Sequence, residues 1–240
     1  MTFDLFSAIG SRDINEDRLG AVVDQNKGIF VAADGLGGHG KGDIASKLVV
    51  QAFEEVFSNP SDLMPTLFPK AFLDAQEAIL AEQRRSGNFF QMKTTACALA
   101  IDGDKLMWGH IGDTRLYAFS HNRVKVRTLD HSVPQMLVLS REIKERDIRS
   151  HPDRNKLLRV LGVSGDAPRF ELSQVQPLRG FQAFLLCTDG FWELILEKEM
   201  CALLKKSRSV GEWLRAMREA VELRGAGRDM DNYSAIAVWV

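Results

Sequence analysis

Short apolar runs separated by turn-forming residues dominate the start of the chain. Three of them, at residues 3–9, 19–23 and 29–33, are rich in β-branched or aromatic residues and are bounded by Gly, Asp or Asn. Such runs predict β-strands, because branched and aromatic side chains fit a pleated, half-buried surface. The beginning of the sequence therefore predicts a group of short strands.

Two segments with near-helical spacing of apolar residues follow these strands. The first covers residues 44–57 and the second residues 71–84. Pro65 and Pro69 lie between them and predict a break, because proline has no N–H to donate inside a helix. The sequence therefore predicts a pair of helices after the first strands.

Strands return after the second helix. Residues 94–101 and 106–111 are joined by Asp102-Gly103-Asp104, which has the composition of a hairpin turn. Further strands are predicted at residues 116–119, 124–128, 184–187 and 233–240, and further helices at residues 198–205 and 210–223. Hairpin-linked strands interrupted by helix pairs favour antiparallel sheets with helices packed outside. With no linker, repeat or low-complexity segment, we expect a single α+β domain over residues 1–240.

Composition and charge narrow the class of protein. The chain is 45% hydrophobic and 26% charged, as in ordinary globular proteins, and its 31 basic and 32 acidic residues give a net charge of −1. This balance argues against nucleic acid or an anionic membrane as the main partner. The first residues lack a signal-peptide pattern, and no apolar stretch approaches the roughly 18 residues of a membrane span. We expect a cytoplasmic protein.

Three aspartates adjoin predicted strands. Asp34 and Asp189 each follow an apolar run and precede a glycine, and Asp231 comes just before the last strand. Carboxylates without histidine or thiol partners suit hard cations such as Mg²⁺ or Mn²⁺. Taken singly, an Asp-Gly pair is more often a turn than a ligand. Asp229, two residues before Asp231, is an alternative ligand.

A fourth group of polar residues lies near the N-terminus. Arg12 is followed by Asn15-Glu16-Asp17, which places a guanidinium close to two carboxylates. The acidic residues of this group could also be a solvated loop.

The run from Asp34 to Gly42 allows three interpretations. Gly35 to Gly40 matches a dinucleotide-binding fingerprint, and Gly35 to Lys41 nearly matches a P-loop, although Gly42 replaces the Ser or Thr that binds Mg²⁺. Both nucleotide sites need a parallel strand to follow, whereas two helices are predicted. We therefore favour the third interpretation, a glycine loop that wraps a metal held by Asp34.

Taken together, the polar motifs occur in a characteristic order along nearly the whole chain. They are Arg12-x-x-Asn15-Glu16-Asp17, Asp34-Gly35-x-Gly37-Gly38-His39-x-x-Gly42, Thr94-Thr95, Gly109-x-x-Gly112-Asp113-Thr114-Arg115, Asp130-His131-Ser132, His151-Pro152 through Arg159-x-Leu161-Gly162, Cys187-Thr188-Asp189-Gly190-Phe191-Trp192-Glu193 and Asp231-Asn232-Tyr233-Ser234. The ordered set resembles the protein phosphatase 2C (PPM) family in its compact bacterial form.

The resemblance implies a fold and a set of metal ligands. The fold would be a four-layer α-β-β-α sandwich, with two central antiparallel β-sheets flanked by helix pairs. Asp34 would bridge two Mn²⁺ or Mg²⁺ ions, and the Gly35 carbonyl would complete one coordination shell. Asp189 and Asp231 would ligate the other ion of the pair, and Asp113 together with Asp189 would hold a third.

The resemblance also implies roles around the metals. Glu16 and Asp17 would act through metal-coordinated water, and Arg12 would bind the substrate phosphate. Leu36 stands where several animal members carry a histidine proposed as general acid, which leaves the proton donor open. Residues 132–160, here called the flap-like segment, resemble a mobile flap beside the active site of bacterial members.

The implied function is hydrolysis of phosphoserine and phosphothreonine on proteins by metal-activated water, reversing a Ser/Thr protein kinase. The alternative is a catalytically weak pseudophosphatase that binds phosphoproteins, or a regulatory module. The presence of all the expected acidic residues and of Arg12 favours the enzyme.

Overall fold

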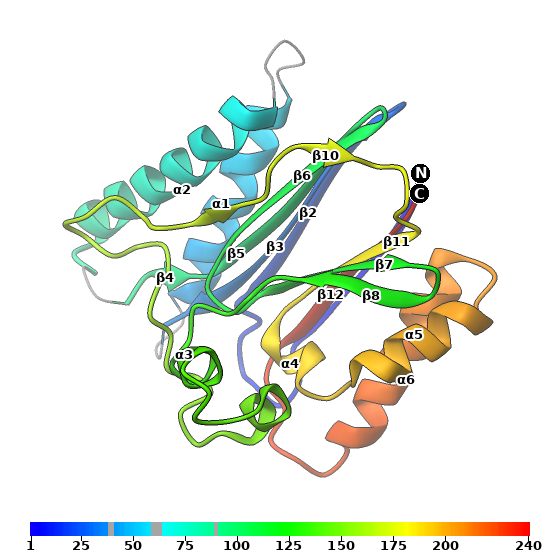
Figure 1. Ribbon diagram of the computed structural model, residues 1–240. Helices are drawn as coiled ribbons and strands as arrows, with labels where there is room; N and C mark the ends of the chain where they lie inside the picture. Colours follow the sequence, from blue (N-terminus) through cyan, green and yellow to red (C-terminus); the bar gives the residue numbers. More distant parts are fainter. Residues whose placement is uncertain (38–40, 59–63, 89–90) are drawn as a thin grey trace.

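Two antiparallel sheets lie face to face at the centre of the molecule, and helices cover the outer face of each (Figure 1). The computed structural model describes residues 1–37, 41–58, 64–88 and 91–240. The expected α+β class and its four layers are confirmed. Because both sheets are covered on their two faces, the middle parts of their central strands are buried and mostly apolar.

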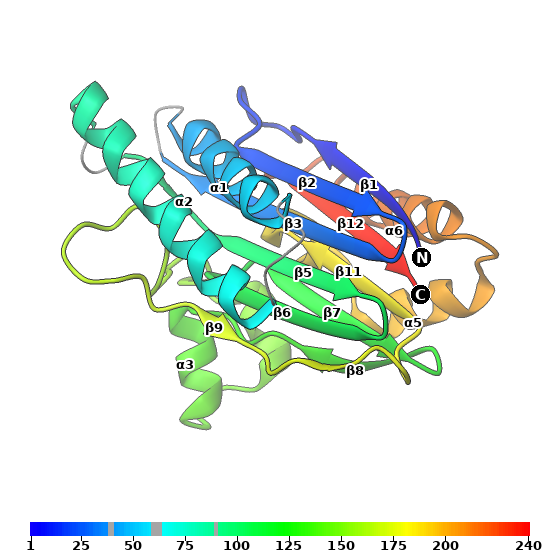
Figure 2. The same cartoon turned by 90° about the horizontal axis from the view of Figure 1, so that it is seen from above.

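The first sheet has five strands in the order β1-β12-β11-β7-β8. They are β1 (Thr2–Ala8), β7 (Arg115–Ser120), β8 (Arg123–Arg127), β11 (Ala183–Cys187) and β12 (Tyr233–Trp239). β1 is an edge strand that pairs with β12 from Thr2 opposite Trp239 to Ala8 opposite Tyr233. The two ends of the chain therefore lie side by side (Figure 2).

The second sheet has seven strands, with β10-β6-β5-β3-β2 in order, β4 beside β3 and β9 beside β6. They are β2 (Asp17–Asp24), β3 (Lys27–Leu36), β4 (Lys93–Thr94), β5 (Ala96–Asp102), β6 (Lys105–Ile111), β9 (Glu171–Leu172) and β10 (Gln176–Pro177). In β5 the alanines at positions 96, 98 and 100 face the helices, while Cys97, Leu99 and Ile101 face the other sheet. Small residues on the helix side let the helices pack close to the sheet.

Each sheet has its own helices. α1 (Gly42–Phe57) and α2 (Met64–Ser86) cover the seven-stranded sheet, and α4 (Asp189–Trp192), α5 (Glu197–Lys206) and α6 (Val210–Gly225) cover the five-stranded sheet (Figure 1). The flap-like segment contains α3 (Val133–Leu139) and the 3-10 helix Glu145–Ser150. The helix predicted at residues 210–223 is α6, whose apolar stripe is buried, with Trp213 and Met217 fully inaccessible. Of the described helices, none has the length and apolar character of a membrane span.

The predicted break at Pro65 and Pro69 is wrong, because α2 begins at Met64 and runs through both prolines. Pro65 lies in the first turn, where backbone N–H groups have no partner within the helix, so its missing N–H costs little. Pro69 lies deeper and removes a hydrogen bond to the carbonyl of Pro65. Burial of Leu67, Phe68 and Phe72 against the sheet outweighs that loss.

Two strand boundaries also differ from the prediction. The strand expected at residues 94–101 is divided at Thr95 into β4 and β5. β3 does not end at Asp34 but continues to Leu36, where Gly35 and Leu36 pair with β4. The interruption at Thr95 turns its hydroxyl and its N–H toward Asp34, as described below.

The position of Pro69 inside α2 predicts that this residue lowers the stability of the helix. Pro69→Ala should raise the free energy of unfolding by about 1 kcal/mol or more, because alanine restores the lost hydrogen bond and removes the clash of the ring with the preceding turn. Urea unfolding followed by circular dichroism measures the change. Leu223→Ala, at a side chain that is 80% exposed on α6, serves as the control and should change stability by less than about 0.5 kcal/mol. A destabilised Pro69→Ala would contradict a continuous helix.

Candidate metal and phosphate site

A cavity of about 600 Å³ opens where the ends of several strands meet. Its lining comes from segments that are far apart in the sequence: Arg12, Asp13, Ile14, Glu16, Asp34, Gly35, Leu36, Gly37, Asp113, Asn155, Leu157, Asp189, Asp231 and Asn232. Every predicted site residue except Asp17 lines it, and Asp17 lies directly opposite Asp34 in the pairing of β2 with β3. Asp229 is not among the lining residues, so the structure favours Asp231 over it.

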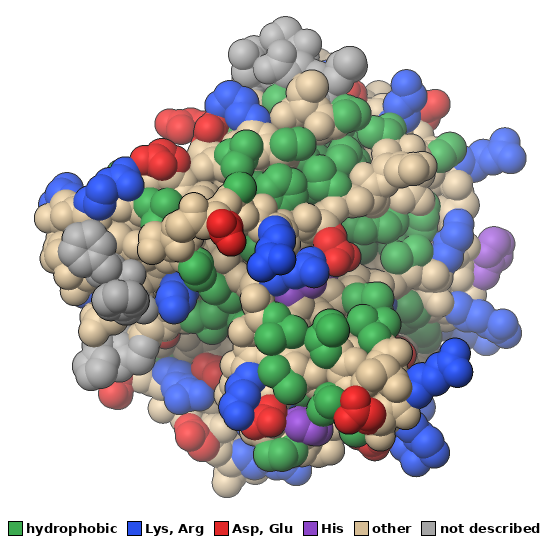
Figure 3. Space-filling model, turned by 60° about the vertical axis from the view of Figure 1, so that its left-hand side comes forward, with side chains coloured by type: hydrophobic (Ala, Val, Ile, Leu, Met, Phe, Trp, Pro, Cys, Tyr) green, Lys and Arg blue, Asp and Glu red, His purple; other side chains and the backbone are tan. Residues whose placement is uncertain are grey.

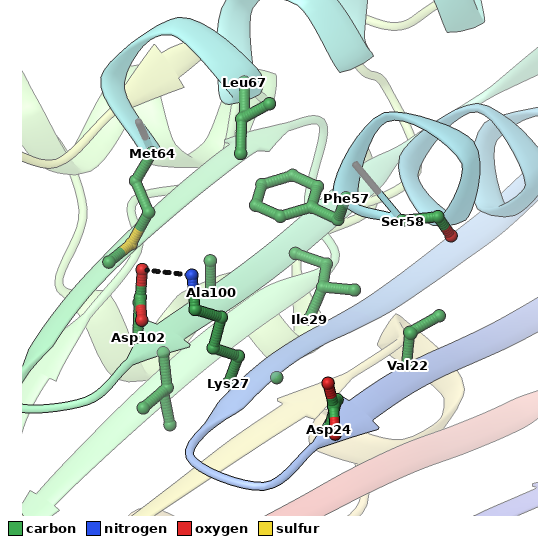
Figure 4. A pocket seen from close by; sticks show the side chains of 12 residues that line it. Val22, Asp24, Lys27, Ile29, Phe57, Ser58, Met64, Leu67, Ala100 and Asp102 are labelled. Atoms are coloured by element: carbon green, nitrogen blue, oxygen red, sulfur yellow. Dashed lines mark ion pairs between the residues drawn. The ribbon is translucent and has the colours of Figure 1, made fainter. Parts of the chain in front are cut away.

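A second cavity, of about 270 Å³, lies at the hairpin between β2 and β3 (Figure 4). Its walls are mostly apolar and include Phe57, Met64 and Leu67. Lys27 and Asp102 also line it and form an ion pair, with 3.2 Å between Nζ and Oδ2. The length of β2 places this hairpin about 23 Å from the carboxylates at the other end of the strand. Its lining does not bring several carboxylates together as the larger cavity does.

The backbone of Asp34 is held by the interruption between β4 and β5. Its N–H donates to Thr95 Oγ1 at 3.0 Å, and its carbonyl accepts from the Thr95 N–H at 2.9 Å and from Thr94 Oγ1 at 2.8 Å. Next to it, the backbones of Gly35 and Gly42 pack so closely that a Cβ on Gly35 would lie 2.3 Å from the Gly42 carbonyl. The two glycines thus allow the loop end to close over Asp34.

Asp113 lies in the turn between β6 and β7, and Asp189 begins α4. The indole N–H of Trp192, one helical turn after Asp189, donates to the backbone carbonyl of Asp113 at 3.0 Å. The guanidinium of Arg115 stacks on the Trp192 ring at 3.4 Å and makes a buried bidentate pair with Asp130 at 2.8 and 2.6 Å. The segments that carry Asp113 and Asp189 are therefore fixed to each other.

Asn232 fixes the N-terminal loop against Asp231. Its amide donates to the carbonyls of Ile9 and Ile14 at 2.8 and 3.1 Å, and its Oδ1 accepts from the N–H of Glu16 at 2.8 Å. The guanidinium of Arg12 then reaches both carboxylate oxygens of Asp231, at 3.1 and 3.0 Å. The pair is partly exposed, and Arg12 lines the cavity, with Nη1 as the guanidinium nitrogen that does not bond Asp231.

The carboxylates of Glu16 and Asp17 differ in their hydrogen-bond partners. Glu16 Oε1 accepts from the Gly42 N–H at 3.0 Å, so this carboxylate closes the glycine loop. Asp17 is 2% exposed, and its Oδ2 accepts from the Thr188 hydroxyl at 2.9 Å. Its Oδ1 is buried and has no hydrogen-bond partner among the described residues. A buried carboxylate oxygen without a partner is costly unless a cation or water completes the site.

The carboxylates raise one another's pKa values. Burial, followed by repulsion from Asp189, Asp17 and Asp113, raises the pKa of Asp34 well above its ordinary value. Burial and repulsion from Asp113 and Asp231 do the same for the pKa of Asp189. Burial raises the pKa values of Asp17 and Asp113 to about 7. Such mutual repulsion requires the groups to be close together.

This donor set suits hard divalent cations. It consists of carboxylate oxygens and a backbone carbonyl around a cavity, and the described residues that line this cavity include no thiol or imidazole group. The partnerless oxygen of Asp17 and the unfavourable ionisation of Asp34 and Asp189 are both relieved by positive charge. Asp34, Gly35, Asp189 and Asp231 could hold two Mn²⁺ or Mg²⁺ ions, and Asp113 with Asp189 could hold a third.

Comparison with known proteins identifies the family and the fold of the chain. A model of the protein phosphatase 2C family matches residues 7–226. The chain belongs to the protein phosphatase 2C family. A serine/threonine phosphatase of Listeria welshimeri is 31% identical over 208 residues, which cover 84% of this chain and 81% of the relative.

Two solved structures show the same protein phosphatase 2C fold. The crystal structure of Stp1 from Staphylococcus aureus has a TM-score of 0.89 at 24% identity and covers 99% of this chain and 94% of its own. The catalytic domain of the phosphatase PstP, solved in complex with two manganese ions, has a TM-score of 0.82 at 24% identity and covers 98% of this chain and 96% of its own.

Several residues that support this protein phosphatase 2C site had no role assigned from the sequence. In the sequence, Thr95, Thr188, Trp192 and Asn232 stand out only as parts of motifs. Their position beside a candidate ligand was the available signal, but which atoms they contact depends on the fold. Asn155 and Leu157 bring the flap-like segment into the cavity lining. Gly38 to Gly40 of the glycine loop lie outside the described residues.

The nucleotide-binding interpretations of the glycine loop receive no support. Two helices, α1 and α2, follow the loop, and the pairings recorded between the described strands of both sheets are antiparallel. A dinucleotide fingerprint needs a parallel βαβ unit. The loop instead ends beside Asp34 and Glu16.

The raised pKa values predict how the metal-free chain responds to pH. Asp17 and Asp113 bind protons more tightly in the folded chain, so their contribution to stability is complete below a pH of about 4 and is lost as the pH rises through about 7. In EDTA, the free energy of unfolding should therefore be lower at pH 7.5 than at pH 5.5, by on the order of 1 kcal/mol per pH unit from each group. Urea titrations at both pH values measure it.

Matched variants identify the groups responsible for this pH dependence. Asp113→Asn should remove the share of one of the two groups, about half of the pH dependence, whereas Asp74→Asn, exposed on α2, should leave it as in the wild type. A wild-type chain that is equally stable at both pH values would contradict the crowding of carboxylates described above.

Proposed function

We propose that this chain hydrolyses the phosphate monoesters of phosphoserine and phosphothreonine in proteins, using divalent cations held by Asp34, Gly35, Asp189 and Asp231, with Asp113 at a third cation. The observation that carries the proposal is one cavity, lined by carboxylates from distant segments, with the guanidinium of Arg12 at its mouth. Membership of the protein phosphatase 2C family supports the same activity.

Arg12 is placed to receive the phosphate. Its planar guanidinium already makes two parallel hydrogen bonds to a carboxylate, and a phosphate offers the same spacing of oxygens. The loop that carries it is held by Asn232, so the guanidinium is directed toward the cavity before substrate binds. Arg12 thus orients the ester and offsets the charge that its oxygens carry.

The carboxylates orient water for attack on phosphorus. Asp17 Oδ1 is buried opposite Asp34 and has no hydrogen-bond partner among the described residues, so it would be free to accept a hydrogen bond from a water molecule that entered the site. Glu16, held by the Gly42 N–H, keeps its second oxygen available for the same purpose. When bound, the divalent cations supply Lewis acidity, which lowers the pKa of water and neutralises phosphate charge. Positioning and charge stabilisation provide most of the catalysis in phosphoryl transfer.

The partner of such an enzyme follows from its reaction. A phosphatase for phosphoserine and phosphothreonine needs a Ser/Thr protein kinase that supplies its substrates, and we propose that this chain reverses such a kinase. The chain retains Arg12 and all five expected aspartates, which favours the enzyme over a pseudophosphatase.

The metal dependence is tested with a phosphothreonine peptide. Turnover should require Mn²⁺ or Mg²⁺ and cease in EDTA, and Asp34→Asn and Asp189→Asn should each lower kcat by about 100-fold or more, because each removes a carboxylate that holds cations. Phosphate release measures the rates. Asp166→Asn, on an exposed loop, is the matched control and should be as active as the wild type. Full activity after dialysis against EDTA would refute the mechanism.

Arg12 gives a different kinetic signature. Arg12→Ala should raise KM by about tenfold or more while kcat changes by less than about threefold, because the phosphate loses a contact while the carboxylates stay in place. Steady-state kinetics on the same peptide separate the two constants. Arg215→Ala, on the outer side of α6 with a side chain 69% exposed, controls for loss of a positive charge. A fall in kcat with KM unchanged would exclude a phosphate-binding role.

A further inference from the structure

Two sequence motifs remain outside the chemistry described so far. Leu161 and Gly162, from Arg159-x-Leu161-Gly162, anchor the end of the flap-like segment: Leu161 pairs with Thr94, and Gly162 accepts from the amide of Gln83 at 2.8 Å. Two motif residues still have no role: Arg159, and His131 of Asp130-His131-Ser132. Both residues pair with Glu171 in one cluster, His131 at 3.2 Å and Arg159 at 3.3 Å. Figure 3 shows one face of the molecule, on which acidic and basic side chains lie close to a histidine.

The cluster has the composition of a transition-metal site. Donor atoms of His110, His131 and Glu171 lie within 4.8 Å of one another. Its hydrogen bonds nevertheless exclude this use of His131. The Gly112 N–H donates to His131 Nδ1 at 3.1 Å, so that nitrogen carries the lone pair and the proton is on Nε2. Nε2 lies 3.2 Å from Glu171 Oε1 and donates to it, and a protonated nitrogen cannot ligate a metal. Arg159 Nη1 lies 3.4 Å from this nitrogen but, as a donor, bonds Glu171 Oε1 at 3.3 Å instead.

His131 instead holds the turn that carries Asp113. Its backbone N–H donates to the Gly112 carbonyl at 2.9 Å while its ring accepts from the Gly112 N–H, so both polar groups of Gly112 are bound by one residue. Gly112 has a φ of +98°, and a Cβ there would lie 2.5 Å from the Thr95 side chain. This backbone conformation is available to glycine at little cost, and the two hydrogen bonds select it.

Glu171 and His110 keep the ring of His131 in the required state. Glu171 accepts the Nε2 proton and also pairs with Arg159 at 3.3 Å. His110 stacks on His131 with ring centres 4.7 Å apart, and its own Nε2 bonds to the Leu129 carbonyl at 2.8 Å. Burial, followed by the neighbouring His110, lowers the pKa of His131 to about 4, so the ring is neutral near pH 7.

We propose that His131 is a positioning residue for the Asp113 cation site, acting through the Gly112 backbone, and that Glu171 fixes the tautomer that makes this possible. The proposal rests on the proposed function, in which Asp113 holds a cation. Asp113 is 5% exposed, and its own carbonyl is bound by Trp192 on the other side of the turn. The backbone that carries the Asp113 carboxylate is therefore held on both sides, by one hydrogen bond from the Trp192 indole of α4 and by two with His131.

Two substitutions at residue 131 separate the parts of the imidazole. In His131→Asn the amide oxygen stands near the position of Nδ1 and still accepts from the Gly112 N–H. In His131→Gln the amide reaches the position of Nε2 and meets Glu171, but the acceptor for Gly112 is lost. Both variants retain a polar side chain that can form hydrogen bonds, so a difference between them reports on the contact to Gly112.

The measurement is calorimetric titration of Mn²⁺ into the purified full chain, with Asp113→Asn defining which binding event depends on Asp113. His131→Gln should weaken that event by about tenfold, and His131→Asn should stay within about threefold of the wild type. In turnover assays at limiting Mn²⁺, adding His131→Gln to Asp113→Asn should cause no further loss, because both changes act on one site. Thermal unfolding of each variant identifies those that fold.

A second substitution tests the cluster from its exposed side. Glu171→Ala should weaken the same event by about threefold, whereas Glu171→Gln, which still accepts from Nε2–H, should not. In the His131→Asn background, which has no tautomer to fix, Glu171→Ala should have no effect.

The outcomes separate this inference from the proposed function. The role of His131 would be overturned if His131→Gln bound Mn²⁺ as tightly as the wild type. It would also be overturned if the turnover losses of His131→Gln and Asp113→Asn added up in the double variant, or if no Mn²⁺ binding event depended on Asp113. Loss of all Mn²⁺-dependent turnover in the wild type would instead refute the proposed function.

Discussion

Mutual repulsion of carboxylates is the constraint that organises this molecule. Asp17, Asp34, Asp113, Asp189 and Asp231 are brought around one cavity, and burial makes their charges more costly. Left alone, such groups would separate or take up protons. The residues around them oppose this by fixing the backbone: Thr95 binds Asp34, Trp192 binds the carbonyl of Asp113, and Asn232 ties the N-terminal loop to Asp231. The rigidity of the two sheets is what makes the site possible.

The site draws on both halves of the sandwich. Asp17 and Asp34 come from the seven-stranded sheet, Asp231 and Asp189 adjoin strands of the five-stranded sheet, and Asp113 lies where the chain passes from one to the other. A cation bound among them joins the two sheets at one end, where the hydrophobic layer between them gives way to polar residues. Stability and catalytic competence are therefore expected to depend on the same contacts.

Much of this arrangement was predictable from the sequence because the relevant signals are local. Strand alternation, the apolar stripe of α6 and the Asp-Gly pairs each depend on neighbouring residues, and the order of the motifs indicated the family. The start of α2 was not predictable, because burial of Phe68 and Phe72 against the sheet overrides the effect of Pro69. The role of His131 was not predictable either, since it depends on which ring nitrogen faces Gly112.

The pairing of β1 with β12 has a mechanical consequence. β1 is an edge strand, and its residues pair one by one with the last strand of the chain, beginning at Thr2 beside Trp239. A pulling force applied between the two ends would break the hydrogen bonds of these pairs one after another, starting at Thr2. It would therefore separate β1 from β12 before it strained the rest of the two sheets. The loop that carries Arg12 follows β1 directly, so tension at the ends would next separate the Arg12 guanidinium from Asp231.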